Sequence, residues 1–356
     1  MNLRSLLGWF ARHGRDLPWR RTREPYAIWV SEIMLQQTRV KSAIPYYERW
    51  MRALPDIAAV ARASPEKAHK LWEGLGYYAR ARHLLEAARL IRREHGGRFP
   101  QDFDQVLALP GIGRCTAGAV CSIAFNQPRP ALDGNVLRVL SRWFGVNGDP
   151  QAKATNARLW RLAQGLMDRA SRLGAAGACS RLTQSLIELG ALICTPRQPQ
   201  CALCPVADRC VARRQGRASA LPRRARRPQP TARRFAAFVI RRRGRVLVRQ
   251  RPAGVVNAHL WEFPNVELRP GNTSPQHAAR HLLGIEPAAL EPLCALRHSI
   301  TRYRITLEAF LITERQAGPF SPVAIRGRWL NPRQLARLPF ATAHRRILEQ
   351  LPGREG

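Results

Sequence analysis

Four cysteines lie close together in the second half of the chain, and their spacing suggests metal chemistry. They stand at Cys194, Cys201, Cys204 and Cys210, separated as C-x6-C-x2-C-x5-C. Four thiolates this close are able to enclose one metal centre, and an iron–sulfur cluster takes four thiolate ligands. Structural zinc also takes four thiolates, but it usually has two short C-x2-4-C pairs, and this segment has one. Disulfides, which need an oxidising compartment, and four unrelated core cysteines are the other interpretations.

Two carboxylates that are distant in the sequence form a candidate acid–base pair. Glu32 lies in an apolar helical stretch that begins near Pro25, so we expect it to be partly buried. Burial raises the pKa of a carboxyl group and makes it a candidate general acid. Asp133 precedes a predicted helix over 136–143, whose first N–H groups would keep the carboxylate ionised. A solvated surface Glu and a purely capping Asp are the alternatives.

A turn with two glycines precedes another apolar helical stretch. Gly111 and Gly113 belong to Leu-Pro-Gly-Ile-Gly, and small and apolar residues follow over 116–125. Glycine lets the backbone turn tightly and approach a phosphate, and the following helix N-terminus offers free N–H groups. Gly-x-Gly alone is a weak signal because tight turns are common. Together with the preceding Leu-Pro, the helix and the cysteine loop, it indicates contact with a nucleic-acid backbone.

The elements that must position these residues divide the chain into two regions and a linker. Over 1–215 apolar residues recur at helical spacing, and strand-like alternation is absent. Residues 216–234 are rich in Arg and Pro, which is typical of a linker. From Phe235 the pattern changes to period two and indicates a smaller α+β domain. We expect strands over 235–240, 246–248, 260–263 and 303–312 and helices over 275–283 and 339–351.

Length and charge limit the classes of function. The chain has 356 residues, enough for two domains, and its 59 basic against 24 acidic residues give a formal net charge of +35. Such a charge attracts a polyanion, either nucleic acid or an anionic membrane surface. No apolar run reaches transmembrane length, and the N-terminus lacks a signal-peptide cleavage site. We therefore expect a cytoplasmic protein in which the remaining cysteines, Cys115, Cys121, Cys179 and Cys294, are reduced.

In combination these motifs resemble the MutY-type adenine DNA glycosylases, helix-hairpin-helix proteins of the endonuclease III superfamily with a C-terminal Nudix-like domain. The resemblance covers nearly the whole chain. It implies an all-α glycosylase domain at 1–215 with a [4Fe–4S] loop at 194–210, a linker at 216–234, and an α+β Nudix-like domain at 235–356. The segments that carry it are 17–20 (LPWR), 31–38 (SEIMLQQT), 72–82 (WEGLGYYARAR), 109–113, 133–136 and 194–210.

The resemblance also implies a function and a set of site residues. The chain would be a monofunctional enzyme, acting as a monomer in a bacterial-type cytoplasm, that excises adenine opposite 8-oxoguanine or guanine in double-stranded DNA. Glu32 would protonate the adenine, and Asp133, supported by Asn135, would stabilise the sugar cation. The implied adenine-pocket residues are Arg15, Trp19, Arg20 and Gln184. The implied DNA-contacting residues are Gln37, Tyr77, Leu109, Gly111 and Gly113, with core packing as the alternative for Tyr77.

Position 115 distinguishes this chain from a lyase. Endonuclease III relatives have a lysine there that attacks the sugar, whereas this chain has Cys115, and a thiol does not form a Schiff base. Adenine glycosylases usually have Ser or Tyr at this position, so Cys115 departs from both patterns. A non-catalytic damage sensor is the second alternative, but it would lack Glu32 or Asp133, and both are present.

The C-terminal region resembles the Nudix-like domain through Leu-Trp-Glu-Phe-Pro at 260–264. A Nudix hydrolase needs acidic residues on a helix to bind a divalent metal, and 277–284 has none, so we expect recognition and not hydrolysis. The family's 8-oxoguanine loop, His-x-Phe-Ser-His, becomes His-Ser-Ile-Thr-Arg here. His298 matches and Thr301 keeps the hydroxyl, while Ile300 and Arg302 depart. A surface turn between strands is the alternative interpretation.

Overall fold

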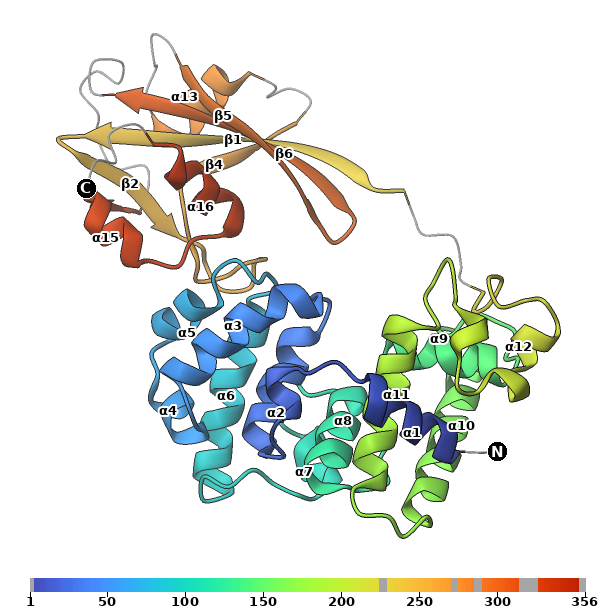
Figure 1. Cartoon of the computed structure of the whole chain (residues 1–356). Helices are drawn as coiled ribbons and strands as arrows, with labels where there is room; N and C mark the ends of the chain where they lie inside the picture. Colours follow the sequence, from blue (N-terminus) through green and yellow to red (C-terminus); the bar gives the residue numbers. More distant parts are fainter. Residues whose placement is uncertain (1–2, 224–228, 270–273, 285–289, 314–325, 352–356) are drawn as a thin grey trace. The chain divides into compact units, whose positions relative to one another are not determined.

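The computed structural model describes the chain apart from six short stretches (Figure 1). These are residues 1–2, 224–228, 270–273, 285–289, 314–325 and 352–356. The chain divides into two compact units, which we call the helical unit and the sheet unit. The helical unit comprises Met1–Ala63 and His83–Arg226, and the sheet unit comprises Ser64–Arg82 and Arg227–Gly356.

The described part of the helical unit consists of α-helices and short 3-10 turns, which confirms the helical class expected for this region. In chain order they are α1 (Leu3–His13), η1 (Pro18–Arg20), α2 (Pro25–Leu35), α3 (Val40–Ala53), α4 (Ile57–Arg62), α6 (Ala79–Glu94), α7 (Phe103–Leu107), α8 (Arg114–Phe125), α9 (Gly134–Trp143), α10 (Lys153–Ser171), α11 (Ala178–Leu192), η2 (Cys201–Leu203), η3 (Ala207–Arg209) and α12 (Val211–Arg214). The first residues of α6 belong to the sheet unit.

Helix α9 presents an apolar face to the core that it shares with α1, α10 and α11. Four of its buried residues follow the i, i+3, i+4, i+7 pattern: Val136, Val139, Leu140 and Trp143. Helix α11 approaches the start of α9 closely, because Gly190 has no side chain where a Cβ would lie 2.6 Å from the Asn135 Cβ. This close packing places the residues around Asp133 beside α11.

A second glycine brings the same region against α8. At Gly118 a Cβ would lie 1.9 Å from the Pro130 carbonyl oxygen, so only glycine fits this position. The chain from Pro130 to Asp133 therefore runs along α8, the helix that carries Cys115 near its N-terminus.

The sheet unit contains a mixed sheet with the strand order β3-β2-β1-β6-β5, in which β4 also pairs with β1 and β7 with β2 (Figure 1). The central pair β1 and β6 is parallel. Its elements are α5 (Pro65–Trp72), β1 (Thr231–Arg242), β2 (Arg245–Gln250), β3 (Trp261–Glu262), β4 (Asn265–Leu268), α13 (Pro275–Leu283), β5 (Glu291–Ile300), β6 (Tyr303–Thr313), β7 (Arg328–Leu330), α15 (Pro332–Arg337) and α16 (Thr342–Glu349).

Both faces of this sheet are covered, because the buried side chains of β1 alternate between two cores. Ala237 and Val239 belong to the core that contains residues of α15 and α16. Ala236, Phe238 and Ile240 belong to the core that contains residues of α13. An alternating strand with helices on both faces is the α+β arrangement that the period-two pattern predicts.

Several boundaries differ from the sequence expectations. Strand β1 begins at Thr231, so residues 231–234, assigned to the linker by composition, already pair with β6. These residues pair through their backbones while their side chains are mostly exposed, so their composition does not show the strand. Strand β5 was not expected, because it lies at the sheet edge and few of its side chains are buried. Helix α13 has the predicted bounds, with Ser274 as N-cap.

The segment Ser64–Arg82, expected in the helical domain, groups with the sheet unit. Its Glu73 carboxylate accepts hydrogen bonds from the Phe340 backbone N–H at 2.8 Å and from Arg345 Nε at 2.9 Å and Nη2 at 2.7 Å. These bonds lie between residues far apart in the sequence, so local patterns do not reveal them. Among the described helices, none is long and apolar enough to cross a membrane.

Candidate active site and cysteine loop

Glu32 is the one charged residue of α2, a helix that is otherwise largely buried. Burial raises the pKa of its carboxyl group to about 7, and the negative charge of Asp133 adds to this effect. The positive charge of Arg20 acts in the opposite direction. Within the described residues the Glu32 carboxylate receives no hydrogen bond. The structure therefore brings Glu32 and Asp133 together and gives Glu32 the pKa of a general acid at neutral pH.

Asp133 is the N-cap of α9. Its Oδ1 accepts hydrogen bonds from the Asn135 N–H at 3.0 Å and the Val136 N–H at 2.7 Å, and its Oδ2 accepts one from Asn135 Nδ2 at 3.2 Å. Burial nevertheless raises the pKa of Asp133 above its ordinary value. The donors and Arg138 offset part of that effect, and the negative charge of Asp133 raises the pKa of Glu32.

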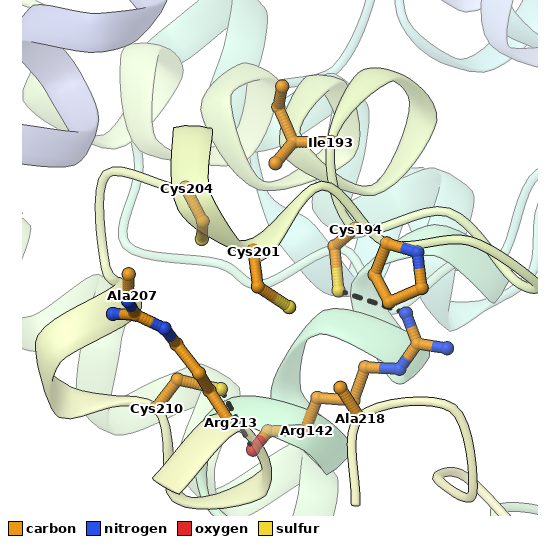
Figure 2. Close-up of a pocket in the computed structure, with 10 residues that line it drawn as sticks. Arg142, Ile193, Cys194, Cys201, Cys204, Ala207, Cys210, Arg213 and Ala218 are labelled. Atoms are coloured by element: carbon orange, nitrogen blue, oxygen red, sulfur yellow. Dashed lines mark hydrogen bonds between the residues drawn. The ribbon is translucent and has the colours of Figure 1, made fainter. Parts of the chain in front are cut away.

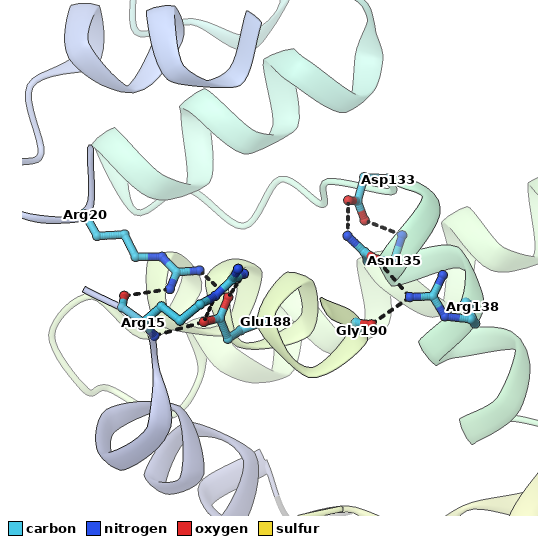
Figure 3. Close-up of polar contacts among 7 residues, drawn as sticks. All are labelled: Arg15, Arg20, Asp133, Asn135, Arg138, Glu188 and Gly190. Carbon is cyan, nitrogen blue, oxygen red and sulfur yellow. Dashed lines mark hydrogen bonds and ion pairs between the residues drawn. The ribbon is translucent and has the colours of Figure 1, made fainter. Parts of the chain in front are cut away.

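A buried arginine connects the residues around Asp133 to the cysteine loop. Arg138 Nη2 donates to Asn135 Oδ1 at 2.8 Å and to the Gly190 carbonyl at 2.7 Å (Figure 3). Arg138 Nε donates to the Cys194 carbonyl at 2.7 Å. This arrangement orients the Asn135 amide toward Asp133. The sequence interpretation missed Arg138, although an arginine within the apolar run of α9 was a usable signal.

Arg15 and Arg20, two of the predicted adenine-pocket residues, meet on one carboxylate that the sequence interpretation also missed (Figure 3). Arg15 Nε and Nη2 each lie 2.8 Å from an oxygen of Glu188, and Arg20 Nη2 lies 2.8 Å from Glu188 Oε2. Gln184 is on α11 one turn before Glu188, so both project from the same side of that helix. Trp19 is buried, with its ring edge-on to Tyr47 at 5.2 Å.

The glycine turn lies between α7 and α8. Gly111 has φ +78°, and a Cβ there would lie 2.5 Å from the His83 Cβ, so this position requires glycine. Gly113 is the N-cap of α8, and no described side chain caps that helix. The first N–H groups of α8 are therefore left for a ligand. Leu109, also expected to contact DNA, has a buried side chain and is only 2% exposed, so a contact with DNA there stays a prediction for its backbone.

Gln37 and Tyr77, the two residues expected to enter the DNA stack, share an unusual backbone conformation. Gln37 has φ 55° and Tyr77 has φ 49°, although neither is glycine. Both side chains are exposed, and Tyr77 is 49% exposed, which is unusual for an aromatic residue. Core packing is therefore ruled out for Tyr77. Left-handed non-glycine residues are strained and concentrate at functional sites.

Cys115 is close to both carboxylates. Burial, with the charges of Asp133 and Glu32, raises the pKa of its thiol to about 12. The side chain at this position is therefore a neutral thiol at physiological pH.

The four clustered cysteines line one pocket (Figure 2). Burial, with the neighbouring cysteines, raises the pKa of the Cys204 thiol to about 11, so positive charge nearby would favour its thiolate form. Buried Arg142 supplies one such charge. Its Nη1 lies 3.4 Å from Cys194 Sγ and 2.6 Å from the Thr195 carbonyl, and Nε donates to the Leu221 carbonyl at 2.8 Å.

The four thiols that line this pocket are the ligand set that a four-iron cluster takes, one thiolate for each iron atom.

In the sheet unit, His298 lies in β5 and Thr301 in the turn between β5 and β6, so the expected reading loop is a strand end plus a hairpin turn. The Nδ1 of His298 is buried without a hydrogen-bond partner among the described residues. Burial and Arg346 lower the pKa of His298, so the ring is neutral at pH 7. Thr301 has φ 52°, a strained value for a β-branched residue.

Comparisons with known proteins agree with both units. Residues 30–164 match the helix-hairpin-helix superfamily of base excision DNA repair proteins. Residues 194–210 match the iron–sulfur binding domain of endonuclease III, and residues 236–350 match the NUDIX domain. A solved structure of a thermostable thymine-DNA glycosylase aligns with a TM-score of 0.53 and 29% identity, over 60% of this chain and 95% of that one.

Fold and cysteine loop together define a helix-hairpin-helix DNA glycosylase with an added Nudix-like domain. Adenine DNA glycosylase of Rattus norvegicus is 35% identical over 97% of this chain and 76% of its own length, and that of Homo sapiens is 34% identical over 99% and 74%. The chain belongs to the adenine DNA glycosylase family, which confirms the resemblance seen in the sequence. It is a DNA N-glycosylase of base excision repair and carries a [4Fe–4S] cluster.

Proposed function

We propose that this glycosylase removes adenine opposite 8-oxoguanine or guanine in duplex DNA by a monofunctional mechanism. The observation that carries the proposal is a pair of carboxylates that lie near each other and differ in their hydrogen bonds. Glu32 has a pKa of about 7, while Asp133 holds three hydrogen bonds that favour its ionised form. Glycosidic cleavage through a sugar cation needs such a pair, one protonated and one ionised.

In this mechanism Glu32 donates its proton to a ring nitrogen of the extruded adenine. The bond between adenine N9 and sugar C1′ then breaks, the electron pair leaves with the neutral base, and the sugar becomes cationic. Asp133 stabilises that cation, held in place by Asn135 and Arg138. Water adds to C1′ and loses a proton, which leaves an abasic site.

The neutral thiol of Cys115 supports the monofunctional assignment. A lyase needs an amine at position 115 that attacks C1′ of the sugar. The buried thiol of Cys115, with a pKa of about 12, is neither an amine nor an activated nucleophile. The product is therefore an intact strand with an abasic site, which breaks only in alkali.

Contact with DNA is assigned to the α8 N-terminus and to two exposed residues. The uncapped N–H groups that follow Gly113, reached through the turn at Gly111, suit a phosphate of the backbone. Gln37 and Tyr77 suit insertion into the base stack that adenine leaves, where an aromatic ring replaces lost stacking. Gln184, Trp19, Arg15 and Arg20 would contact the extruded base.

For the cluster, we assign Cys194, Cys201, Cys204 and Cys210 as the ligands. A cluster held by these residues would supply the positive charge that keeps four thiolates together, and the loop would then fix the Cys194 carbonyl to which Arg138 donates. Its role in this proposal is structural.

The purified chain is expected to contain about four iron and four sulfide per molecule and to be brown. Cys204→Ser should lose most of the cluster and bind DNA more weakly, because the loop loses its central crosslink. Cys294→Ser, a change to a cysteine of the sheet unit, is the matched control and should keep iron content and affinity. Iron and sulfide analysis with DNA-binding titrations checks this, and zinc without sulfide would refute the ligand assignment.

The sheet unit is assigned to recognition of the base opposite adenine. Its α13, the helix at the position where a Nudix hydrolase binds metal, contains no Asp or Glu, so hydrolysis is not supported. The exposed Thr301 hydroxyl donates to the Ile300 carbonyl and can still accept a hydrogen bond from an oxidised base, and His298 lies in the strand that leads into this turn.

A panel of four duplexes tests the proposed function, with adenine opposite 8-oxoguanine, guanine, cytosine or thymine. Single-turnover adenine release should be fastest opposite 8-oxoguanine, slower opposite guanine and weak opposite the pyrimidines, with strand breaks only after alkali. Thr301→Ala should reduce the preference for 8-oxoguanine over guanine by about fivefold or more, as expected for a lost specific hydrogen bond of about 1–3 kcal/mol. Ser299→Ala, the neighbouring exposed hydroxyl, is the control. Breaks without alkali, or equal release from all four duplexes, would contradict the proposal.

A further inference from the structure

Glu188, on α11, is a fully buried carboxylate in the helical unit. Besides its bonds to the Arg15 and Arg20 side chains, its Oε1 accepts the Arg15 backbone N–H at 2.9 Å. It therefore receives four hydrogen bonds, three from Arg15 and one from Arg20 (Figure 3). These partners lower the pKa of Glu188 to about 2 despite its burial, so it is ionised throughout the neutral range.

Arg20 makes two further contacts besides its ion pair with Glu188. Arg20 Nη1 donates to the Arg15 carbonyl at 3.0 Å, and the Arg20 guanidinium lies 5.2 Å from the centre of the Phe10 ring. The bidentate contact with Glu188 fixes the planar guanidinium of Arg15, and the two bonds of Arg20, to Glu188 and to the Arg15 carbonyl, fix that of Arg20. One buried anion with two cations leaves a net positive charge beside the catalytic acid.

That charge acts on Glu32. The charged and titratable groups that influence the Glu32 carboxylate come from three elements: Asp133 from the start of α9, Arg20 from η1, and Cys115 from α8. Asp133 favours the protonated form of Glu32 that catalysis needs, and Arg20 opposes it. The field of Arg20 at Glu32 depends on whether the anion bonded to Arg20 is present.

We infer that Glu188 is a positioning residue for adenine excision: it holds Arg15 and Arg20 at the base pocket and neutralises Arg20 so that Glu32 stays protonated at neutral pH. This inference rests on the proposed role of Glu32 as the general acid. Glu188 itself acts through the two arginines and does not need to touch the substrate. A purely structural anchor would affect folding and rate, but it would not change the pH at which Glu32 loses its proton.

The test is the pH dependence of single-turnover adenine release by the full chain on a duplex with adenine opposite 8-oxoguanine. Wild-type release should decline above about pH 7, as Glu32 ionises. In Glu188→Gln the unneutralised guanidiniums lower the pKa of Glu32, so the decline should begin about 0.5–1 pH unit lower. Glu188→Asp keeps the charge; its rate should fall through altered geometry while the midpoint stays at the wild-type pH.

Arg20→Met gives an independent result, because it leaves the Arg15–Glu188 pair and removes the opposing charge. The midpoint of the decline in adenine release should move to higher pH in Arg20→Met, opposite to the shift in Glu188→Gln. If Glu188→Gln does not fold, the Arg20→Met midpoint tests the inference instead. Glu94→Gln, the same change at an exposed residue paired with Arg93, should behave like wild type.

A slower Glu188→Gln with an unchanged midpoint, or shifts of the Glu188→Gln and Arg20→Met midpoints in the same direction, would overturn the inference. Glu32→Gln separates the two hypotheses: if it stays active, the proposed general acid is wrong, whereas an inactive Glu32→Gln with an unshifted Glu188→Gln removes only the role of Glu188.

Discussion

Glu32→Gln is expected to abolish adenine release while leaving DNA binding nearly intact. The amide is almost isosteric with the carboxylic acid but has no proton to donate at the moment when the glycosidic bond breaks. General acids of this kind contribute about 10²–10⁴-fold to the rate, and the variant should lose at least that much. Single-turnover release and titration of a labelled duplex measure the two effects separately.

The unfolding temperature distinguishes a loss of adenine release by Glu32→Gln from misfolding of that variant. Because the folded-state pKa of Glu32 is raised to about 7, the folded protein is progressively disfavoured as pH rises from the unfolded pKa, near 4.5, to about 7. Glu32→Gln removes that penalty and should unfold at a higher temperature than wild type at pH 8. Glu48→Gln, the same change at an exposed position of α3, should leave rate and stability unchanged. Release at the wild-type rate by Glu32→Gln would disprove the assignment.

Asp133→Asn is expected to cost about 10²–10³-fold in the rate of release, since a neutral amide does not stabilise a sugar cation as a carboxylate does. The α9 N-terminus should stay intact, because asparagine is as good an N-cap as aspartate. A second consequence concerns pH. The Asp133 charge raises the pKa of Glu32, so its removal should move the decline of the residual activity to lower pH.

Asp102→Asn is the matched control for Asp133→Asn. Asp102 caps α7 in the same way, with its carboxylate accepting from the Asp104 and Gln105 N–H groups. This control makes the same chemical change at another N-cap, away from Glu32 in the sequence. If both variants lost activity equally, helix capping and not charge would explain the loss. A fully active Asp133→Asn would remove Asp133 from the mechanism.

Short segments of sequence predict much of the fold and of the candidate site. Period-two alternation from Phe235 predicts the strands, and Ser274 with Pro275 and Gly284 predicts the bounds of α13. The spacing of the cysteines predicts one metal centre, because ligands within seventeen positions converge almost regardless of the remaining fold. Asp133 as an N-cap and Gly111 as a turn residue follow from backbone geometry over two to four neighbours.

Contacts between distant segments were decided by the tertiary structure alone. Glu188 meets Arg15 across 173 positions, and its sequence neighbours on α11 give no sign of two arginine partners. Arg142 likewise finds the Cys194 sulfur 52 positions away. Leu109 was expected to face DNA, but the packing around it buries its side chain.

The pKa values of Glu32 and Asp133 show why local sequence predicts some features while only the folded structure determines others. The sequence determined that Glu32 lies on an apolar helix and Asp133 at a helix start, since hydrophobic periodicity and capping are local. How far each pKa moves depends on the atoms that exclude water and on the charges that lie near: Asp133 and Arg20 for Glu32, and Arg138 for Asp133. Desolvation and Coulomb interactions depend on distance in space and not along the chain, so only the folded structure determined how the two pKa values shift.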